Sequence, residues 1–336
     1  MTKQGATGAP GPIQAIPMPP ARAPSTRIQL RHLDVGQGHR IALATAGDPG
    51  HPAVLIVHGG PGSGSRLRRP WLFDPASHYL VWVDQRGCGR SRPRGGVRRN
   101  TTPLLLRDFE RVREHLGLQD WWVYGGSWGA ALALAYAAAH PRRVRALLLR
   151  APYLTSRRDT ERFFQAGRSR APKSWRALLQ AAGATRGGKL LHCCATVSRD
   201  GTVAARRALG LAWSRYERAM LLHRAGAAKR PGPRAARELA DTYRVQAHYL
   251  ARQCWLGRDG LRRAAMALRE AALPVLAVQG RRDRVCPAAN LRLLRGWLPA
   301  MEARVIDSGH LETEPAMLRA LRQGLARLLR EGPDAG

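Results

Sequence analysis

The residues with the clearest chemical signature are 125–129, whose sequence Gly-Gly-Ser-Trp-Gly contains a G-x-S-x-G pattern. Residues 121–124 before it have the composition of a buried strand, and the alanine- and leucine-rich residues 130–139 after it have that of a helix. A serine on a sharp turn from strand to helix is exposed for nucleophilic attack, and the flanking glycines avoid collisions in so tight a turn. The pattern therefore predicts that Ser127 is a catalytic nucleophile. The alternative is a serine that only caps the following helix.

A serine hydroxyl is a weak nucleophile at neutral pH, so a base must take its proton. His310 follows the strand-like residues 304–306 and a small turn at 308–309, which would place it at the carboxyl end of the last strand, beside Ser127. We therefore expect His310 to be the base. The alternative is a surface loop histidine, one of eleven histidines in the chain.

The acid that orients this histidine should lie between the serine and the histidine in the chain, at the end of a strand. Asp283 satisfies both conditions, because it stands in the loop that leaves the strand-like residues 274–279. Asp307 is the rival acid, but it is only three residues from His310 and near the end of its own strand, so it is poorly placed to reach the imidazole. We expect Asp283 to complete the triad.

The tetrahedral intermediate of acyl transfer needs hydrogen-bond donors for its oxyanion. Residues 58–62, His-Gly-Gly-Pro-Gly, follow the strand-like residues 53–57 and form a glycine-rich loop of the kind that supplies one such donor. We expect the backbone N–H groups of Gly60 and Trp128 to form the oxyanion hole. A merely structural glycine–proline turn is the alternative.

Composition limits the kind of molecule that carries these residues. The chain has 336 residues, 44% of them hydrophobic, and no apolar run long enough to span a bilayer, so we expect no membrane partner. Residues 1–25 are rich in Gly, Pro and Ala and lack the basic start and apolar stretch of a secretion signal, which predicts a flexible tail. Five cysteines without a C-x-x-C spacing favour a reduced, cytoplasmic protein without a zinc site.

The net charge of +33 is unusual, and a basic balance of this size can indicate a nucleic-acid partner. Only four of the 56 basic residues are lysine, however, and the arginines are spread over almost every segment. Such uniform arginine with abundant alanine is typical of a coding bias toward G and C rather than of a binding patch. We therefore expect no specific nucleic-acid partner, and only loose association at low salt.

Strand-like and helix-like segments alternate along most of the chain. After a predicted hairpin, several strands are continuous apolar runs, which suit a parallel sheet covered by helices on both faces. The predicted strands are residues 28–35, 39–46, 53–57, 79–83, 121–124, 146–149, 275–278 and 304–306. Helical segments such as 102–116 and 130–140 lie between them, which predicts a doubly wound α/β fold.

This alternation stops between residues 153 and 270. The segment is rich in Ala, Leu and Arg with helical spacing, has Gly/Pro breaks near Gly183 and at 231–233, and shows no good strand. We therefore expect residues 153–270 to form a helical cap inserted into an α/β core made of residues 26–152 and 271–336.

Three linked motifs resemble those of one family, the prolyl aminopeptidases (proline iminopeptidases) among the α/β-hydrolases. They are His-Gly-Gly-Pro-Gly at 58–62, Asp-Gln-Arg-Gly-Cys-Gly-Arg-Ser at 84–91 and Gly-Gly-Ser-Trp-Gly at 125–129, and the acid loop and the Gly-His pair at 309–310 are similar as well. The likeness extends over the chain from Ile28 to the C-terminus. It implies an α/β-hydrolase fold. It also implies an enzyme that releases N-terminal proline from small peptides without a metal or organic cofactor.

The resemblance also implies residues that bind the substrate. In the family, a carboxylate of the cap in a W-x-x-W-E-like segment holds the free terminal amine, and residues 213–217 are similar, which assigns this role to Glu217. A second family carboxylate aligns with Gln246, which accepts hydrogen bonds but brings no charge, and the aromatic of that stretch is replaced by Leu250. Tyr153 matches an aromatic of the pocket that packs the proline ring. The alternatives are a solvated Glu217 paired with an arginine, and a Tyr153 that only packs in the core.

The leading prediction is therefore a serine exopeptidase that acts on small peptides with a free N-terminus. The runner-up keeps the same machinery for another small ester or amide, which the changes at Gln246 and Leu250 would permit. A third hypothesis, from a different class, is an arginine-rich protein that binds polyanions on a retained hydrolase scaffold.

Overall fold

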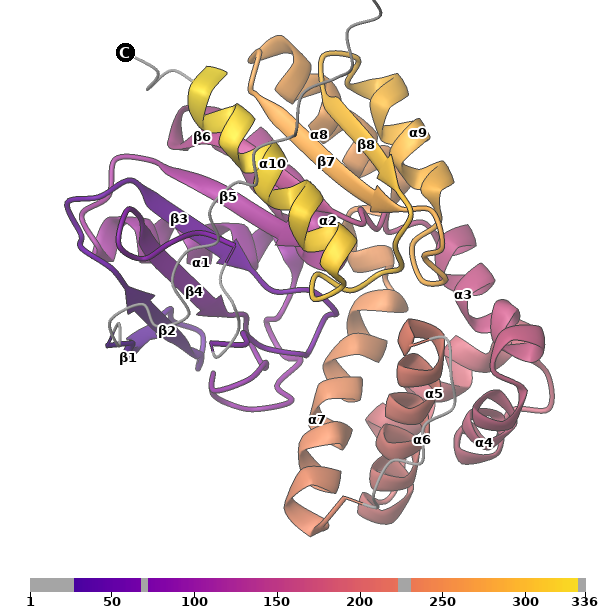
Figure 1. Ribbon diagram of the computed structural model, residues 1–336. Coiled ribbons are helices and arrows are strands. Elements are labelled where there is room, and N and C mark those ends of the chain that lie inside the picture. Colours follow the sequence, from indigo (N-terminus) through magenta and orange to yellow (C-terminus); the bar gives the residue numbers. More distant parts are fainter. Residues whose placement is uncertain (1–26, 68–71, 223–230, 332–336) are drawn as a thin grey trace, which may run out of the picture.

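A single sheet of eight strands runs through the part of the chain that the computed structural model describes, residues 27–67, 72–222 and 231–331 (Figure 1). Its strands lie side by side in the order β1-β2-β4-β3-β5-β6-β7-β8. They are β1 (Gln29–Asp34), β2 (Arg40–Ala46), β3 (Ala53–Val57), β4 (Tyr79–Asp84), β5 (Trp121–Gly126), β6 (Val144–Arg150), β7 (Val275–Gly280) and β8 (Glu302–Ile306). The predicted tail, residues 1–25, lies outside the described residues.

The sheet is mostly parallel. β1 and β2 form an antiparallel hairpin and β2 also pairs antiparallel with β4, whereas β4, β3, β5, β6, β7 and β8 are parallel to one another. Every residue of β4, β5 and β7 is buried, as expected for continuous apolar strands that are covered on both faces. The predicted doubly wound fold is confirmed, and the observed strands differ from the predicted ones by at most two residues at either end.

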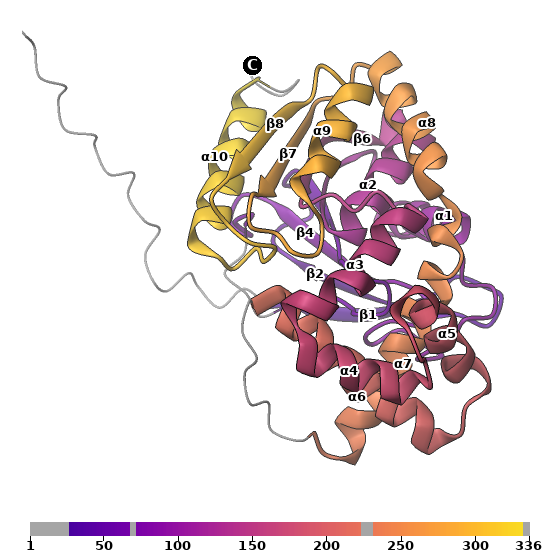
Figure 2. The same cartoon turned by 90° about the vertical axis from the view of Figure 1, so that its right-hand side faces the viewer.

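Helices cover both faces of this sheet (Figures 1 and 2). On one face, α10 (Pro315–Glu331) packs against β6, β7 and β8. On the other lie α1 (Thr102–His115), α2 (Trp128–Ala139), α8 (Gly257–Glu270) and α9 (Ala288–Trp297). Almost all of α2 is buried, because it is enclosed by the sheet on one side and by α1 and α8 on the other. This helix begins directly after Ser127.

Among the described residues, the chain between β6 and β7 consists of helices joined by turns and loops and contains no strand. Its helices before α8 are α3 (Arg157–Arg170), α4 (Pro172–Ala182), α5 (Leu190–Asp200), α6 (Val203–Leu222) and α7 (Pro233–Leu250), with 3₁₀ turns at Gly187–Lys189 and Gln253–Trp255. Helices α4 to α7 pack on one another and lie beyond the end of the sheet, whereas α8 packs against α2 (Figures 1 and 2). The predicted cap falls in this region, and the division of the chain into core and cap stays a prediction.

Helix α7 contacts the loops that follow the central strands. His248 Nε2 lies 2.8 Å from the carbonyl oxygen of Asn100, and the Tyr249 hydroxyl donates to Asn100 Oδ1 at 2.7 Å. A Cβ atom on Gly62 would lie 2.2 Å from the carbonyl oxygen of Thr242, so the glycine lets the loop after β3 touch the backbone of α7. The helix is therefore held directly against the loops at the carboxyl ends of the strands.

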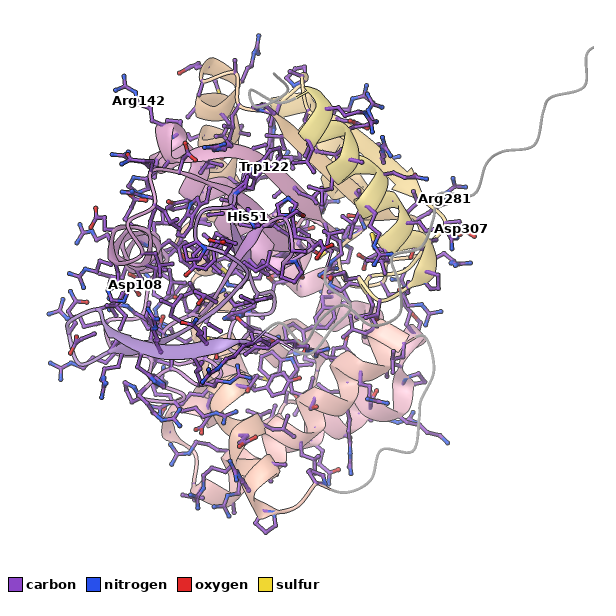
Figure 3. The ribbon with its side chains drawn as sticks, turned by 60° about the vertical axis from the view of Figure 1, so that its left-hand side comes forward. His51, Asp108, Trp122, Arg142, Arg281 and Asp307 are labelled. Carbon is purple, nitrogen blue, oxygen red and sulfur yellow. The ribbon has the colours of Figure 1, made fainter. Side chains whose placement is uncertain are left out.

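Arginine side chains extend outward around the molecule, Arg142 and Arg281 among them (Figure 3). Some pair with a carboxylate one helical turn away, such as Arg157 with Glu161 at 2.7 Å. The chain has 23 acidic and 56 basic residues, so basic side chains outnumber acidic ones by more than two to one. No helix among the described residues is both long and apolar enough to cross a membrane.

Candidate active site

Ser127 stands on the sharp turn between β5 and α2, with a φ of 59° and a ψ of −120°. The turn is possible because of the two glycines around it: a Cβ on Gly125 would lie 2.3 Å from the carbonyl oxygen of Gly129, and one on Gly129 would lie 2.3 Å from that of Val57. The Ser127 side chain makes no capping hydrogen bond to α2. This contradicts the alternative of a merely capping serine and leaves the hydroxyl free for chemistry.

Asp283 and His310 are in direct contact. His310 Nδ1 lies 2.7 Å from Asp283 Oδ2, and both residues are buried. The other carboxylate oxygen accepts the backbone N–H groups of Val285 and Cys286 at 2.8 and 2.9 Å. Burial acts to raise the pKa of Asp283, but the interaction with His310 and these two donors outweigh it and lower that pKa below its usual value. The acid therefore stays ionised and orients the imidazole.

Asp307, the rival acid, has a different environment. Its side chain is 70% exposed, pairs with Arg282 at 3.2 Å and points outward at the edge of the molecule (Figure 3). A carboxylate in this position is surrounded by solvent and by an arginine rather than by the imidazole. The loop after β7, not the end of β8, thus supplies the acid that contacts His310.

The loop that carries Asp283 also reaches the serine. Ser127 Oγ lies 3.9 Å from Sγ of Cys286, a buried residue whose thiol pKa is raised well above its usual value by burial. Sequence reasoning did not assign Cys286 to the site, although its position three residues after the acid was a usable signal. This loop brings the elements that carry the serine, the acid and the histidine into one place.

Arg150, the last residue of β6, connects the serine to the histidine loop. Its carbonyl oxygen accepts the backbone N–H of Ser127 at 2.8 Å, and its guanidinium donates to the carbonyl oxygen of His310. Tyr124 and Glu312 also interact with this guanidinium, and the Tyr124 hydroxyl donates to Glu312 Oε2 at 2.6 Å. Ser127 and His310 are thus both tied to one residue of the sheet.

The predicted oxyanion loop, residues 58–62, leaves β3 beside the serine turn on β5. His58 is buried, and burial lowers its pKa, which keeps the imidazole neutral. The backbone of this loop approaches the start of α2, since a Cβ on Gly129 would also lie 2.9 Å from the His58 carbonyl oxygen. Gly60 and Trp128 therefore belong to two segments that touch.

Glu217 lies on α6 and faces α7. Its carboxylate accepts a hydrogen bond from the Tyr243 hydroxyl at 2.9 Å and another from the side-chain amide of Gln246. Burial raises the pKa of Glu217, and these two donors and His310 oppose the rise. These contacts do not fit a solvated carboxylate paired with a surface arginine. The contribution of His310 to the Glu217 pKa indicates that the two residues are within electrostatic reach of each other.

Two further residues, Tyr243 and Tyr153, lie close to Glu217 and to the serine turn respectively. Tyr243 was not assigned from the sequence, although it precedes Gln246 by three positions and so shares its face of α7. Tyr153 follows β6, its backbone N–H donates to the Ser127 carbonyl oxygen at 3.4 Å, and its hydroxyl lies 2.5 Å from Thr160 Oγ1. The structure therefore places Tyr153 beside the serine turn, in partial contact with the core.

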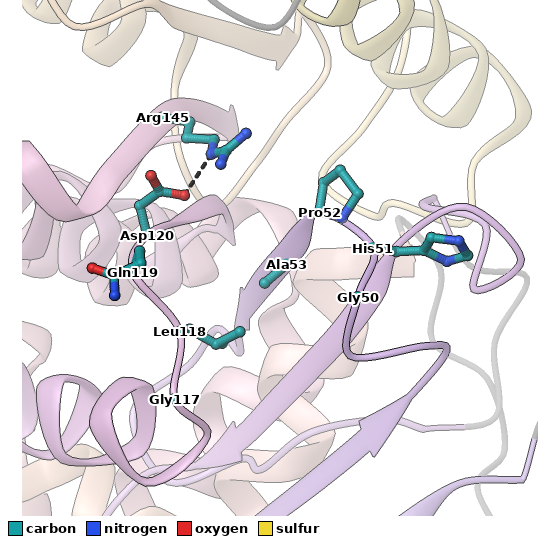
Figure 4. Close-up of a pocket in the computed structure, with 9 residues that line it drawn as sticks. All are labelled: Gly50, His51, Pro52, Ala53, Gly117, Leu118, Gln119, Asp120 and Arg145. Atoms are coloured by element: carbon teal, nitrogen blue, oxygen red, sulfur yellow. Dashed lines mark hydrogen bonds and ion pairs between the residues drawn. The ribbon is translucent and has the colours of Figure 1, made fainter.

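A cavity of about 240 Å³ lies at the other end of the sheet (Figure 4). Its lining includes Pro52, Leu118 and an ion pair between Arg145 and Asp120, and it opens where β3, β5 and β6 begin. Parallel sheets bind their ligands at the carboxyl ends of the strands, where Ser127 lies, so this cavity is separate from the candidate site. The described residues contain no group of three or more His, Cys, Asp or Glu side chains able to hold a metal.

Comparisons with known proteins agree with this architecture. The profile of the α/β hydrolase fold family matches residues 52–312. Among solved structures, a haloalkane dehalogenase from Bradyrhizobium elkani has a TM-score of 0.62 at 18% identity, covering 90% of this chain and 98% of that one. A proline iminopeptidase-related protein from Thermus thermophilus has a TM-score of 0.53 at 22% identity, covering 90% and 98%. At these identities the likeness shows the fold alone.

Curated relatives give the narrower family. The proline iminopeptidase of Neisseria meningitidis serogroup B is 33% identical over 310 residues, which cover 89% of this chain and 95% of that protein. The proline iminopeptidase of Xylella fastidiosa is 35% identical over 295 residues, covering 86% and 93%. Identity of this extent spans the serine turn, the acid loop and the helices between β6 and β7 together. The chain therefore belongs to the α/β-hydrolase fold family and, within it, to the proline iminopeptidases that its motifs resemble.

Proposed function

We propose that this protein is a prolyl aminopeptidase, a serine exopeptidase that releases an N-terminal residue, preferably proline, from small peptides. The relatives that match nearly the whole chain carry the name proline iminopeptidase. The observation that carries the proposal to this chain is the Glu217 carboxylate, which is held by Tyr243 and Gln246 within the electrostatic reach of His310. A fixed negative group beside a serine hydrolase site is the partner that a substrate's cationic N-terminus needs.

In the proposed mechanism, Ser127 Oγ attacks the carbonyl carbon of the first residue while His310 Nε2 takes the hydroxyl proton. The C–N bond then breaks, His310 gives this proton to the leaving nitrogen, and the first residue remains as an ester on Ser127. Water attacks the ester with His310 again as the base, and Oγ leaves as the hydroxyl. Asp283 holds the imidazole throughout, and the backbone N–H groups of Gly60 and Trp128 stabilise the oxyanion.

In the same proposal, Glu217 binds the substrate's terminal amine and Tyr153 contacts the ring of a bound proline. A bound cation would favour the ionised carboxylate and so oppose the rise in pKa that burial imposes on Glu217. Because Gln246 is neutral, Glu217 supplies the negative charge on its own. The distance from this anchor to Ser127 limits cleavage to one residue, since the amine of a longer N-terminal extension would overshoot the carboxylate.

We also propose that the chain is divided into a catalytic core and a substrate-binding cap. Residues 26–152 and 271–336 form the core that carries the triad and the oxyanion loop, and residues 153–270 form the cap that carries Glu217, Gln246 and Tyr153. All five cysteines are free, which supports a cytoplasmic location. The partner is a small peptide with a free N-terminus.

Steady-state hydrolysis of aminoacyl anilides tests the function. Proline, alanine and arginine anilides are compared with free and with acetylated amines, on the wild type and on Ser127→Ala. We expect turnover of the free-amine substrates only, fastest with proline, and a loss of roughly 10⁶-fold in kcat in the variant. Equal turnover of acetylated substrates, or of simple esters alone, would instead favour the runner-up, a hydrolase of another small ester or amide, for which the neutral Gln246 is the supporting observation.

A further inference from the structure

The two donors of the proposed oxyanion hole come from separate segments of the chain. Gly60, which carries one donor N–H, lies in the loop after β3. Trp128, which carries the other, is the first residue of α2, after β5. An oxyanion needs both donors at hydrogen-bond distance at once, and an error of about 1 Å in such a geometry can slow a reaction by roughly 100-fold. Some contact must therefore fix the distance between these two segments.

Gln85, directly after β4, contacts both of them. Its side-chain Nε2 donates to the carbonyl oxygen of His58 at 3.0 Å, and its Oε1 accepts the indole N–H of Trp128 at 3.0 Å. Because β3 lies between β4 and β5 in the sheet, the Gln85 side chain crosses the end of β3 to reach α2. One amide group thus bridges the oxyanion loop and the residue after the nucleophile.

A third hydrogen bond makes this bridge rigid. The backbone N–H of Gln85 donates to Nε2 of the His58 ring at 3.1 Å, so Nε2 must be the unprotonated nitrogen. The ring proton is then on Nδ1, which lies 3.0 Å from the carbonyl oxygen of Gly59. Gln85, His58 and Trp128 are all buried, so these hydrogen bonds do not compete with water.

We propose that Gln85 is a positioning residue for the oxyanion hole: its side-chain amide sets the separation between the Gly60 and Trp128 donors. This inference rests on the proposed function and deepens it. Gln85 does not touch the substrate, so its removal leaves the amine anchor at Glu217 unchanged and affects the transition state more than substrate binding.

Two variants break the bridge in different places. Gln85→Met keeps the length of the side chain and removes both of its hydrogen bonds, whereas Trp128→Phe keeps the backbone donor and removes the indole N–H together with part of the ring. We expect either change to lower kcat on proline anilide by about 10- to 100-fold while KM stays within about twofold. In the double variant, kcat should fall by less than the product of the two single losses, because both substitutions remove the same hydrogen bond between Gln85 and Trp128.

An inhibitor separates positioning from general damage. In pyrrolidine-2-boronic acid, boron binds the serine oxygen and becomes tetrahedral, so a boron oxygen occupies the oxyanion position. Its inhibition constant should rise in Gln85→Met by the same factor as kcat falls, whereas the inhibition constant of free proline should not change.

Tyr136→Phe is the matched structural control. The Tyr136 hydroxyl is at the far end of α2, where it donates to Glu110 at 2.6 Å and accepts from the Trp121 indole at 3.1 Å. This variant also loses two buried hydrogen bonds and should lower the melting temperature, with kcat unchanged. The proposal is overturned if Gln85→Met and Tyr136→Phe lose equal stability and equal kcat, or if Gln85→Met raises KM alone. If the wild type does not hydrolyse proline anilide, the proposed function is contradicted instead. Gln85→Met and Tyr136→Phe are then compared on the ester that the wild type cleaves.

Discussion

Glu217 is half-buried, accepts hydrogen bonds from Tyr243 and Gln246, and has a pKa that burial raises. The folded protein therefore holds the carboxyl proton more tightly than the unfolded chain does. The neutral carboxyl favours folding below the unfolded pKa of about 4.3, and this contribution is lost as the pH rises through the folded-state pKa. Above the folded-state pKa the empty site carries an ionised group that opposes folding, which is typical of a residue kept for function rather than for stability.

Glu217→Gln should separate these two effects. We expect kcat/KM for free-amine proline substrates to fall by roughly 100-fold or more, because the substrate cation loses its charged partner. The melting temperature of the free variant should exceed that of the wild type at pH 8, and the difference should shrink as the pH falls. Steady-state kinetics and thermal unfolding at several pH values measure both.

The control for this change is Glu238→Gln on α7, whose carboxylate pairs with Arg94 at 3.2 Å and Arg234 at 3.3 Å. It also removes one negative charge from the region between β6 and β7, and we expect no change in kcat/KM from it. Equal losses in the two variants would mean that the overall charge of this region, and not a specific anchor, attracts the substrate.

Among the elements, α7 has two roles. One set of its side chains, Tyr243 and Gln246, holds Glu217, and another set, His248 and Tyr249, binds to Asn100 of the core. The Tyr249 ring also packs on Trp128, with ring centroids 5.4 Å apart. A displacement of α7 would therefore move Glu217, the proposed amine anchor, and the start of α2 together.

Gly62→Ala tests this coupling. Gly62 has a φ of +99°, and the new Cβ would lie 2.2 Å from the Thr242 carbonyl oxygen, so either the oxyanion loop or α7 must move. We expect kcat/KM on proline anilide to fall by about 10-fold or more. Gly183→Ala is the control, since Gly183 also has a positive φ, +63°, but its Cβ would meet no atom within 4 Å. It should lower the melting temperature through backbone strain alone. Unchanged kinetics in Gly62→Ala would show that loop and helix move independently.

At the scale of the whole molecule, the net charge of +33 is the feature that bears most on stability. Like charges at this density repel one another and destabilise the compact state, and salt screens that repulsion. We expect the melting temperature to rise when NaCl is increased from about 10 mM to about 300 mM, with kcat/KM on proline anilide nearly constant. An equal osmolarity of sucrose controls for effects unrelated to charge. A melting temperature that falls with salt would mean that ion pairs such as Arg157–Glu161 outweigh the repulsion.

The sequence was sufficient for the fold because its strands are continuous apolar runs and its glycines mark the turns. The sharp turn at Ser127 and the contact between Asp283 and His310 could be predicted because each of these residues follows a strand, and parallel strands end at the same edge of a sheet. Cys286 and Gln85 could not be placed in the same way. Their contacts with Ser127 and Trp128 join residues far apart in the chain, and depend on how each loop folds after its strand.

The order of strands leaves β1 and β8 at the two edges of the sheet. A free edge presents unpaired backbone groups on which a strand of another molecule can be added. β1 carries Arg31, His32 and Asp34, all on a mostly exposed strand, and β8 carries Glu302 and Arg304. Charged side chains on an edge strand disfavour the addition of another strand, because they must leave water when the edge is covered. The charged side chains of β1 and β8 thus act against edge-to-edge aggregation, to which an open sheet is prone.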